Sequence, residues 1–472
     1  MEKKAQVVII GAGPAGYPAA FHAADHGLDV VLVDREENPG GVCLYRGCIP
    51  SKALLHVAGV IEEARAARAW GVTFAPPTLD LDGIRAWKQS VVEKLTGGLG
   101  HLSRQRKIRY VRGAARLTGA DQVEVATAEG VTVIQAEHIV LASGSRPATL
   151  PGLPATPRIM DSTQALELPE IPRRLLIVGG GYIGLELGQA YAALGAEVSV
   201  CEVLETLLTG ADRDLAQVLA RRLQRQCKEI MLGTRLEQVR ESAAGLEVTL
   251  QAPDGQALTR AYDRLLVSVG RTPCAADLNL AAAGLAAGAR GFVPHDAQGR
   301  TASRNIFAVG DVAGQPMLAH KATAEAKAAI DALRGLKVEF APRAIPAVVF
   351  TQPEIAWCGL TEQEAADRQM AVEIGRFPWA ASGRALTLGG AEGLTKLIVE
   401  PGTRRILGMG LAGPGAGELI AEGVLAVEMG AVAEDLALTI HPHPTLSETI
   451  MEAAESLLGQ ATHFLKREPK GA

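Results

Sequence analysis

The chain has 472 residues, 48% of them hydrophobic and 21% charged, and its formal net charge is −5. This length accommodates roughly three domains with sizeable cores. The lack of a basic block argues against a nucleic-acid partner, and no apolar run reaches the length of a membrane span.

The beginning of the chain and its cysteine content indicate a cytoplasmic protein. Residues 1–6 lead directly into an apolar strand, which leaves no room for a signal peptide. Six cysteines in so long a chain do not form the disulfide framework of a secreted protein. In a reducing compartment, a disulfide is more often catalytic than structural.

The first predicted element is a dinucleotide-binding unit. An apolar strand over residues 6–10 is followed by a glycine loop, a helix and a second strand that ends at Asp34. The loop glycines are Gly11, Gly13 and Gly16. They let a pyrophosphate approach the helix N-terminus, while the acid binds a ribose hydroxyl. A glycine loop alone is weak evidence, but strand, helix and acid agree here; the alternative for Asp34 is a solvated loop acid.

Residues 40–52 contain two cysteines, Cys43 and Cys48, ahead of a helix that we expect to begin near Pro50. A thiolate just before a helix experiences the positive end of its dipole, which lowers the thiol pKa. Lys52 adds a further positive charge. We interpret the pair as a redox-active dithiol. The alternatives are two inert buried thiols, or half of a zinc site that lacks a second ligand pair of suitable spacing.

The dinucleotide-binding unit then recurs. A strand over residues 175–178 precedes a second glycine loop, and the strand after its helix ends at Glu202. The shift is constant, because 179 − 11 and 202 − 34 both equal 168. A carboxylate at Glu202 accepts ribose hydroxyls and repels a 2′-phosphate, which favours NAD(H) over NADP(H). The first unit adjoins the dithiol, and a flavin can relay its electrons to a nicotinamide, so we assign FAD to that unit.

The rest of the chain is predicted to return to the first sheet and then to form a separate domain. Residues 122–141 alternate as a hairpin with a turn at 129–130, and a short strand over 305–311 ends in Asp311 before a helix. After a linker at 342–346, the sequence predicts an α+β domain. Its strands are expected at 347–350, 394–399 and 406–412, and its helices at 416–429 and 447–458.

A histidine cluster lies near the C-terminal end, at His441 and His443. Histidine suits thiol–disulfide exchange because it can hold and return a proton near neutral pH. Glu448, about one helical turn further on, is placed to orient the imidazole. The alternative is a pair of surface histidines in a proline-rich turn; we do not expect the two histidines to bind zinc.

Together these motifs occur in the order found in flavoprotein disulfide reductases (class I pyridine nucleotide-disulfide oxidoreductases). Over residues 5–460 the chain resembles the dihydrolipoamide dehydrogenases of that class, most closely the enterobacterial type, with further matches at 314–321, 377–385 and 438–441. The resemblance implies an α/β fold with two Rossmann-like domains and a C-terminal α+β dimerisation domain. The expected boundaries are 1–148 with 274–345 for FAD, 149–273 for NAD and 346–472 for dimerisation.

The resemblance also implies an activity. Dihydrolipoyl groups on a carrier domain, from a 2-oxo acid dehydrogenase complex or the glycine cleavage system, would be oxidised while NAD+ is reduced to NADH. FAD would be bound tightly but non-covalently, with NAD+/NADH as co-substrate and no metal. No lipoyl domain precedes Met1, so we expect the lipoyl group to come from another protein.

The resemblance assigns roles to individual residues. Cys48 would be the charge-transfer thiolate against the flavin, and Cys43 the interchange thiol. His443, oriented by Glu448, would be the acid–base of the other subunit's dithiol, so the site would require a homodimer. Residues implied to contact FAD are Gly11, Gly13, Gly16, Asp34, Lys52, Ala115, Asp311 and Ala319. Residues on the NAD side are Gly179, Gly181, Gly184, Glu186, Glu202 and Gly270, with Glu186 also paired to Lys52.

The chain departs from the family pattern between the cysteines, where Tyr45 and Arg46 replace Asn-Val. Our hypothesis is that Arg46 lowers the thiol pKa values or favours an acidic carrier. Glu202 disfavours a glutathione reductase, the complete dithiol disfavours a soluble transhydrogenase, and residues 462–472 lack the second cysteine pair of mercuric reductases. The remaining alternatives are a flavin-binding complex subunit without disulfide turnover, and the same chemistry on an unusual lipoyl carrier.

Overall fold

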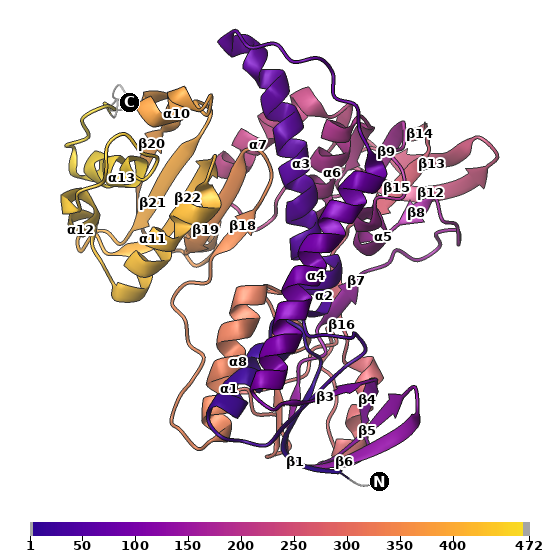
Figure 1. Ribbon diagram of the computed structural model, residues 1–472. Helices are drawn as coiled ribbons and strands as arrows, with labels where there is room; N and C mark the ends of the chain where they lie inside the picture. The colour runs from indigo at the N-terminus through magenta and orange to yellow at the C-terminus, as the bar shows by residue number, and fades with distance from the viewer. Residues whose placement is uncertain (1–2, 466–472) are drawn as a thin grey trace.

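The computed structural model describes residues 3–465, and its large sheets belong to three domains (Figure 1). Residues 1–2 and 466–472, the outer ends of the first and last predicted domains, lie outside the described residues. No helix within 3–465 is long and apolar enough to cross a membrane.

The first domain contains a seven-stranded sheet of order β3-β2-β1-β6-β5-β4, with β17 paired to β6. Its strands are β1 (Lys3–Ile10), β2 (Val30–Asp34), β3 (Arg109–Arg112), β4 (Ala114–Leu117), β5 (Gln122–Thr127), β6 (Gly130–Leu141) and β17 (Ile306–Ala308). The apolar run Val7 to Ile10 is buried on both faces, as expected for a central parallel strand. The predicted hairpin is confirmed, with Thr127 opposite Gly130.

Helices cover this sheet and extend beyond it. They are α1 (Gly16–Asp25), α2 (Gly41–Arg46), α3 (Cys48–Ala66), α4 (Leu81–Gln105) and α8 (Ala319–Leu333). α3 and α4 form a long pair that rises from the first domain along the second (Figure 1). α3 begins at Cys48 rather than near Pro50, and α2 was not predicted, because its leading glycine pair is typical of a loop.

The second domain repeats the parallel arrangement. Its main sheet has the order β11-β10-β9-β15-β8, with a three-stranded antiparallel sheet beside it. The elements are β8 (Ile159–Met160), β9 (Arg174–Val178), β10 (Glu197–Cys201), β11 (Glu229–Met231), β12 (Arg235–Ser242), β13 (Gly245–Gln251), β14 (Ala257–Tyr262), β15 (Arg264–Val267), α5 (Ser162–Glu167), α6 (Tyr182–Leu194) and α7 (Arg213–Gln226). A short antiparallel pair, β7 (Ser145–Pro147) and β16 (Arg271–Pro273), connects it to the first domain.

The C-terminal domain is built on an antiparallel sheet of order β18-β19-β22-β21-β20. Its elements are β18 (Ala347–Val349), β19 (Glu354–Gly359), β20 (Glu373–Pro378), β21 (Leu394–Val399), β22 (Ile406–Gly413), α9 (Glu362–Asp367), α10 (Gly383–Thr387), α11 (Ala416–Met429), α12 (Ala433–Leu438) and α13 (Glu448–Leu458). The predicted strand at 394–399 and helix at 416–429 are reproduced to the residue.

One hydrophobic core joins α3 to the second domain. Leu54 and Ala58 of α3 pack in the same cluster as Leu187 and Tyr191 of α6. Because Cys48 is the first residue of α3, the cysteine pair lies at the junction of the two dinucleotide-binding units.

Candidate active site

The two glycine loops share a hydrogen-bond pattern with the acids that follow them. Asp34 accepts the Ala12 N–H at 2.6 Å and the Glu36 N–H at 3.0 Å. In the second unit, the carboxylate of Glu202 accepts the N–H groups of residues 180 and 204 at 2.5 and 2.8 Å. Each donor and acceptor is displaced by the same 168 positions, so the duplication extends to individual contacts.

Close approach of neighbouring backbone explains the first glycine of each loop. Gly11 and Gly179 have φ of 100° and 112°, which L side chains rarely adopt. A Cβ added at Gly11 would lie 2.3 Å from the Ala142 carbonyl oxygen, and one at Gly179 would lie 2.4 Å from that of Ser268. A substitution at either position must therefore push two strand ends apart.

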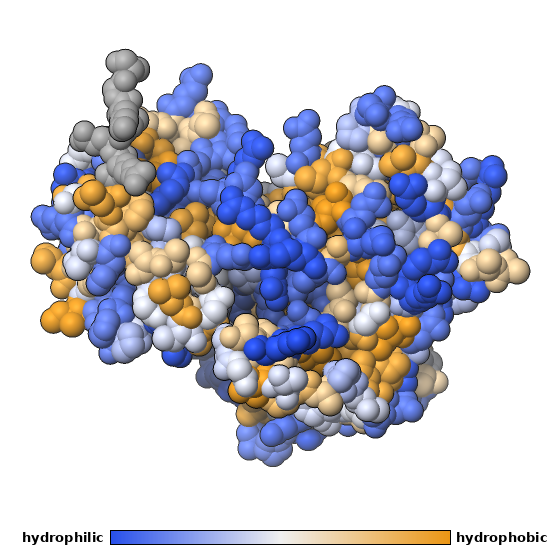
Figure 2. Space-filling view, turned by 90° about the horizontal axis from the view of Figure 1, so that it is seen from above, coloured by the Kyte–Doolittle hydropathy of each residue, from blue (hydrophilic) through white to orange (hydrophobic). Residues whose placement is uncertain are grey.

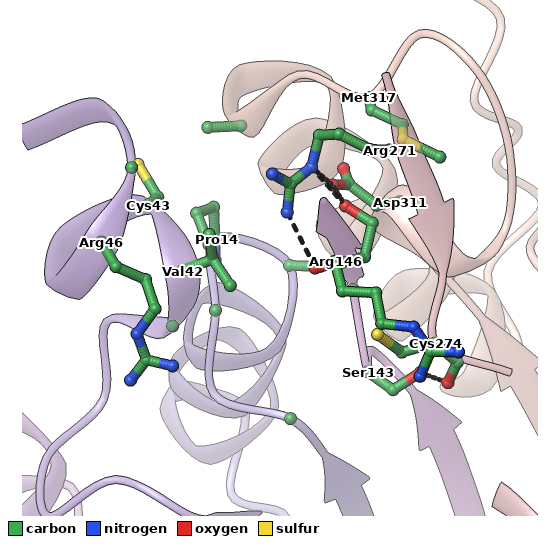
Figure 3. A pocket seen from close by; sticks show the side chains of 18 of the residues that line it. Pro14, Val42, Cys43, Arg46, Ser143, Arg146, Arg271, Cys274, Asp311 and Met317 are labelled. Carbon is green, nitrogen blue, oxygen red and sulfur yellow. Dashed lines mark hydrogen bonds and ion pairs between the residues drawn. The ribbon is translucent and has the colours of Figure 1, made fainter. Parts of the chain in front are cut away.

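A cavity of about 460 Å³ lies at the junction of the two units. Figure 3 shows Cys43 and Arg46 on one side of it, with Arg271 and Asp311 opposite. The predicted residues that line it are Cys43, Cys48, Gly11, Gly13, Asp34, Lys52, Ala115, Asp311, Ala319 and Glu186. Gly16 is not among the lining residues; it packs against the Gly11 carbonyl, where a Cβ would clash.

The cysteine pair is present as two free thiols, Cys43 half-buried and Cys48 exposed. A hydrogen bond from the Cys43 thiol, and then the positive charge of Lys52, lower the pKa of Cys48 to about 7, although burial opposes the shift. The hydrogen bond to Cys48, together with burial, raises the pKa of Cys43 far above its usual range. Ionisation near neutral pH therefore falls on Cys48, while Cys43 keeps its proton.

Lys52 owes its position to Glu186, which comes from α6 of the second unit. Lys52 Nζ lies 2.8 Å from Glu186 Oε2, which also accepts the Ser51 hydroxyl at 2.8 Å. The other carboxylate oxygen accepts the Phe350 N–H at 3.0 Å. Only 3% of the Glu186 side chain is exposed, and this acid lines the cavity, where it forms the pair with Lys52 that the resemblance implied.

Arg46 is not among the groups that lower the thiol pKa values, and its preference for an acidic carrier stays a prediction. Its guanidinium forms an ion pair with Glu36. Lys52, and not Arg46, supplies the charge that lowers the pKa of Cys48. Tyr45 is turned away from the cysteines, and its hydroxyl donates to the Asn38 carbonyl at 3.0 Å.

Several cavity residues were not identified from sequence. Ser145 donates its hydroxyl to Asp311 Oδ2 at 2.5 Å, and Arg271 donates to Ser145 Oγ at 2.7 Å. Tyr182 lines the cavity directly after the second glycine loop, and burial raises its pKa to about 12. Ser145 and Arg271 lie in β7 and β16, the strand pair that connects the first two domains, and neither stands in a sequence motif that marks a ligand site.

Residues assigned to the NAD side lie on the second parallel sheet. Gly179 and Gly181 form the turn from β9 into α6, with Gly181 as the residue that precedes the helix, and Gly184 is the third residue of α6. Glu202 directly follows β10, and Gly270 lies between β15 and β16, where its carbonyl accepts the Ala148 N–H at 3.0 Å. None of these five lines the cavity described above; Tyr182 and Glu186 of α6 link the two regions.

His443 and Glu448 form the predicted pair, which lies on the C-terminal domain. Nδ1 of His443 lies 2.8 Å from Glu448 Oε1, while Glu448 Oε2 accepts the Thr445 N–H at 2.7 Å. Burial acts to raise the pKa of Glu448, but these hydrogen bonds lower it. The His443 side chain is 77% exposed and does not line its own chain's cavity. The neighbouring His441 instead pairs with Glu422 at 2.9 Å.

The cavity fits FAD by its own chemistry. A glycine loop opens it at the N-terminus of α1, where free N–H groups and the helix dipole favour a pyrophosphate. Asp34 offers a carboxylate for a ribose, and Lys52 beside Cys48 offers a cation where a flavin ring would lie against the thiol. The second unit offers a second nucleotide the same two features, a glycine loop that begins at Gly179 and the carboxylate of Glu202.

Two family models together match most of the chain. The model described as pyridine nucleotide-disulphide oxidoreductase matches residues 5–326. The dimerisation domain of the same class matches residues 345–454.

Individual proteins match over nearly the whole length. The chain is 47% identical over 470 residues to a dihydrolipoyl dehydrogenase of Vibrio cholerae, covering 99% of each. It is 45% identical to that of Thermus scotoductus, covering 98% of this chain and all of the relative. Among solved structures, LpdA from Mycobacterium tuberculosis superposes with a TM-score of 0.88 at 27% identity, covering 96% of this chain and 99% of that chain. The Cu(II) complex of RclA, an HOCl-induced flavoprotein disulfide reductase from Escherichia coli, gives 0.86 at 30%, with the same coverage.

Proposed function

Because the chain belongs to the pyridine nucleotide-disulphide oxidoreductase family, we propose that it is a dihydrolipoyl dehydrogenase that uses FAD and NAD+ to oxidise dihydrolipoyl groups. The observation that carries the proposal is the asymmetric thiol pair, with Cys48 activated beside Lys52 in a cavity that fits FAD. Relatives that are nearly half identical and of equal length bear the same name.

The chemistry is a dithiol–disulfide exchange followed by electron transfer. A substrate thiolate attacks Cys43 Sγ of the Cys43–Cys48 disulfide, which breaks the S–S bond and releases Cys48 as a thiolate. The second substrate thiolate then attacks the mixed disulfide, forms the lipoyl disulfide and releases Cys43. Bound FAD supplies the route by which the two electrons pass from the dithiol to NAD+, giving NADH, a proton and the restored disulfide.

The chain's residues are suited to these steps. The pKa of Cys48 near 7 leaves it as thiolate after the exchange, and Cys43 retains its proton. His443 takes protons from the substrate thiols, and Glu448, held by the Thr445 N–H, orients the imidazole through Nδ1. Glu186 holds Lys52 beside Cys48, and Glu202 favours NAD+ over NADP+.

The active site is completed by a second copy of the chain. The C-terminal domain is the dimerisation domain of the family. Exposed apolar side chains lie close in sequence to His443: Ile440 is 94% exposed, Leu438 81% and Met429 76%. Hydrophobic residues are visible at the outer edge of this domain in Figure 2. Burying this surface in a homodimer is the arrangement that brings His443 of one chain to the dithiol of the other.

The remaining parts of the proposal concern the domain boundaries, the lipoyl-bearing partner and the location in the cell. The domain boundaries proposed from sequence are retained, with the FAD domain split around the NAD domain. The substrate is a lipoyl group on a carrier domain of a 2-oxo acid dehydrogenase complex or of the glycine cleavage system. We place the enzyme in the cytoplasm, where the reducing environment lets a cysteine pair cycle between disulfide and dithiol.

The test is anaerobic addition of dihydrolipoamide to the purified holoenzyme, followed by NAD+. A long-wavelength absorption band should appear first and then vanish as NADH forms, whereas NADP+ should leave it in place. Cys48→Ser should retain FAD and lose both signals. A flavin spectrum that dihydrolipoamide leaves unchanged, in enzyme that NADH reduces, would reject the lipoyl substrate. Tight FAD binding together with no loss of function in Cys48→Ser would instead favour the flavin-binding subunit without disulfide turnover.

A further inference from the structure

A fully buried lysine lies at the centre of three carboxylates. Lys396 has 0% of its side chain exposed. Its Nζ lies 2.6 Å from Asp212, 2.6 Å from Asp214 and 2.8 Å from Glu362. These carboxylate oxygens are close enough together to hold a metal ion, but the lysine ammonium occupies the position between them. We call this group the Lys396 cluster; it also includes Arg376, which pairs with Asp214 at 3.0 Å and with Glu362.

The Lys396 cluster connects two domains. Lys396, Arg376 and Glu362 belong to β21, β20 and α9 of the C-terminal domain. Asp212 and Asp214 lie at the N-terminus of α7 in the second domain. Asp212 also accepts the Glu362 N–H at 2.9 Å. Removal of one partner from a buried charge cluster leaves the others uncompensated, so the loss of any one of these groups should destabilise the junction of the two domains.

Asp212 also ends the loop that follows Glu202, the acid of the predicted NAD site. Residues 203–211 connect Glu202 to Asp212. Midway along this loop, the Leu208 N–H donates to the Gly180 carbonyl at 3.0 Å, while the Gly180 N–H donates to Glu202. Leu208 and the preceding Glu202 thus join this segment to the second glycine loop, and Asp212 joins its end to the C-terminal domain.

The loop needs such support because its backbone is strained. Leu208 is buried and has φ of 52°, in the left-handed region that a leucine rarely occupies. A residue in this conformation persists only where surrounding contacts enforce it. Burial of Leu207 and Leu208 provides one restraint, and the attachment of Asp212 to Lys396 provides the other.

We propose that Lys396 is a positioning residue for NAD(H), which holds Asp212 and thereby keeps residues 203–211, Gly180 and Glu202 in the geometry that binds the adenosine ribose. The inference deepens the proposed function and rests on its assignment of the second glycine loop to NAD. The dithiol and the flavin cavity contain no residue of the Lys396 cluster. The effect of losing Lys396 is therefore confined to the nucleotide half of the reaction.

Lys396→Met in the holoenzyme tests the proposal. We expect the Kd for NAD+, measured by calorimetry on the oxidised enzyme, to rise about tenfold. Flavin content and the rate at which dihydrolipoamide reduces the flavin should match wild type. Lys88→Met is the matched control: Lys88 is also buried, but its Nζ donates to the Leu166 carbonyl, away from the nucleotide loop. Its Kd for NAD+ should equal that of wild type.

A second variant separates positioning from stability. Lys396→Met leaves the Lys396 cluster with more excess negative charge, whereas Lys396→Met combined with Glu362→Gln restores the original balance of one excess negative charge. The double variant should regain thermal stability but keep the weak NAD+ binding. Recovery of the Kd together with Tm, an unchanged Kd in either variant, or an equal rise in Lys88→Met would overturn the proposal. If wild-type enzyme is not reduced by dihydrolipoamide, the proposed substrate fails, but the Kd comparison still decides the role of Lys396.

Discussion

Lys52 Nζ lies 2.8 Å from Glu186 Oε2, so the cation that follows the second cysteine on α3 is held by an acid from α6 of the other glycine-loop unit. The two side chains act on Cys48 in opposite directions: Lys52 lowers the thiol pKa and Glu186 raises it. The charge state of the dithiol is thus set jointly by the two dinucleotide-binding units.

Substitutions of Lys52 and Glu186 should shift the Cys48 pKa in opposite directions. The Cys48 thiolate is lost as the pH falls through its pKa of about 7, and the long-wavelength band of the reduced enzyme should be lost with it. Lys52→Met removes a charge that lowers the pKa, so the band should fade at higher pH. Glu186→Gln removes a charge that raises it, so the band should persist to lower pH. A pH titration of the band measures both shifts.

Arg46→Met provides the control for this titration. Arg46 lies in the same cavity, but its guanidinium pairs with Glu36 and does not shift the Cys48 pKa. The midpoint should equal that of wild type. A shift in Arg46→Met with none in Lys52→Met would contradict the assignment of the charge to Lys52.

A mixed dimer should recover activity that neither parent possesses. Cys43→Ser removes the interchange thiol, and His443→Gln removes an acid–base group, which typically lowers turnover by about 10²–10⁴-fold. Co-expression with two different affinity tags yields the heterodimer, in which one site combines an intact dithiol with an intact histidine. Turnover well above that of both homodimers is expected. Inactive heterodimers would mean that thiols and histidine act within one chain.

Asp34 and Glu202, the corresponding acids of the two units, should affect the binding of different nucleotides. Glu202→Gln removes the negative charge that we assign to the ribose in the second unit, so the preference for NAD+ over NADP+ should fall by about tenfold, because a charged hydrogen-bond acceptor is replaced by a neutral one. Asp34→Asn, its counterpart, should weaken FAD retention and leave that preference unchanged. Steady-state kinetics with both nucleotides and the flavin content after dialysis separate the two. Interchanged effects would reverse the assignment of cofactors to the two units.

The exposed apolar surface near His443 should be required for dimerisation. Ile440→Asp places a charge where the proposed interface is dry, and the dimer should dissociate at micromolar concentration because burying an unpaired charge is costly. Val131→Asp alters another exposed apolar side chain, in the first domain, and should remain dimeric. Sedimentation velocity distinguishes them. A stable Ile440→Asp dimer would place the interface elsewhere.

Sequence reasoning succeeded where the chemistry is local along the chain. Strand, glycine loop, helix and acid follow one another within about two dozen residues, so their spacing predicts the turn and brings Asp34 and Glu202 next to it. It missed the contact from Arg271 to Ser145, whose partners are 126 positions apart and meet only when β7 pairs with β16. It also missed Lys396, because a lysine in an apolar strand gives no sign of the acids that surround it.

The repeated contact, from Ala12 to Asp34 and again from Gly180 to Glu202, locates where the two nucleotide sites must differ. A shared module that recognises the adenosine portion in the same manner cannot distinguish a flavin from a nicotinamide. Discrimination must therefore reside beyond the ribose, in what adjoins each copy: Cys43 and Cys48 beside the first, and residues 203–211 after the second. These are the segments to exchange when a related chain is given a new electron acceptor.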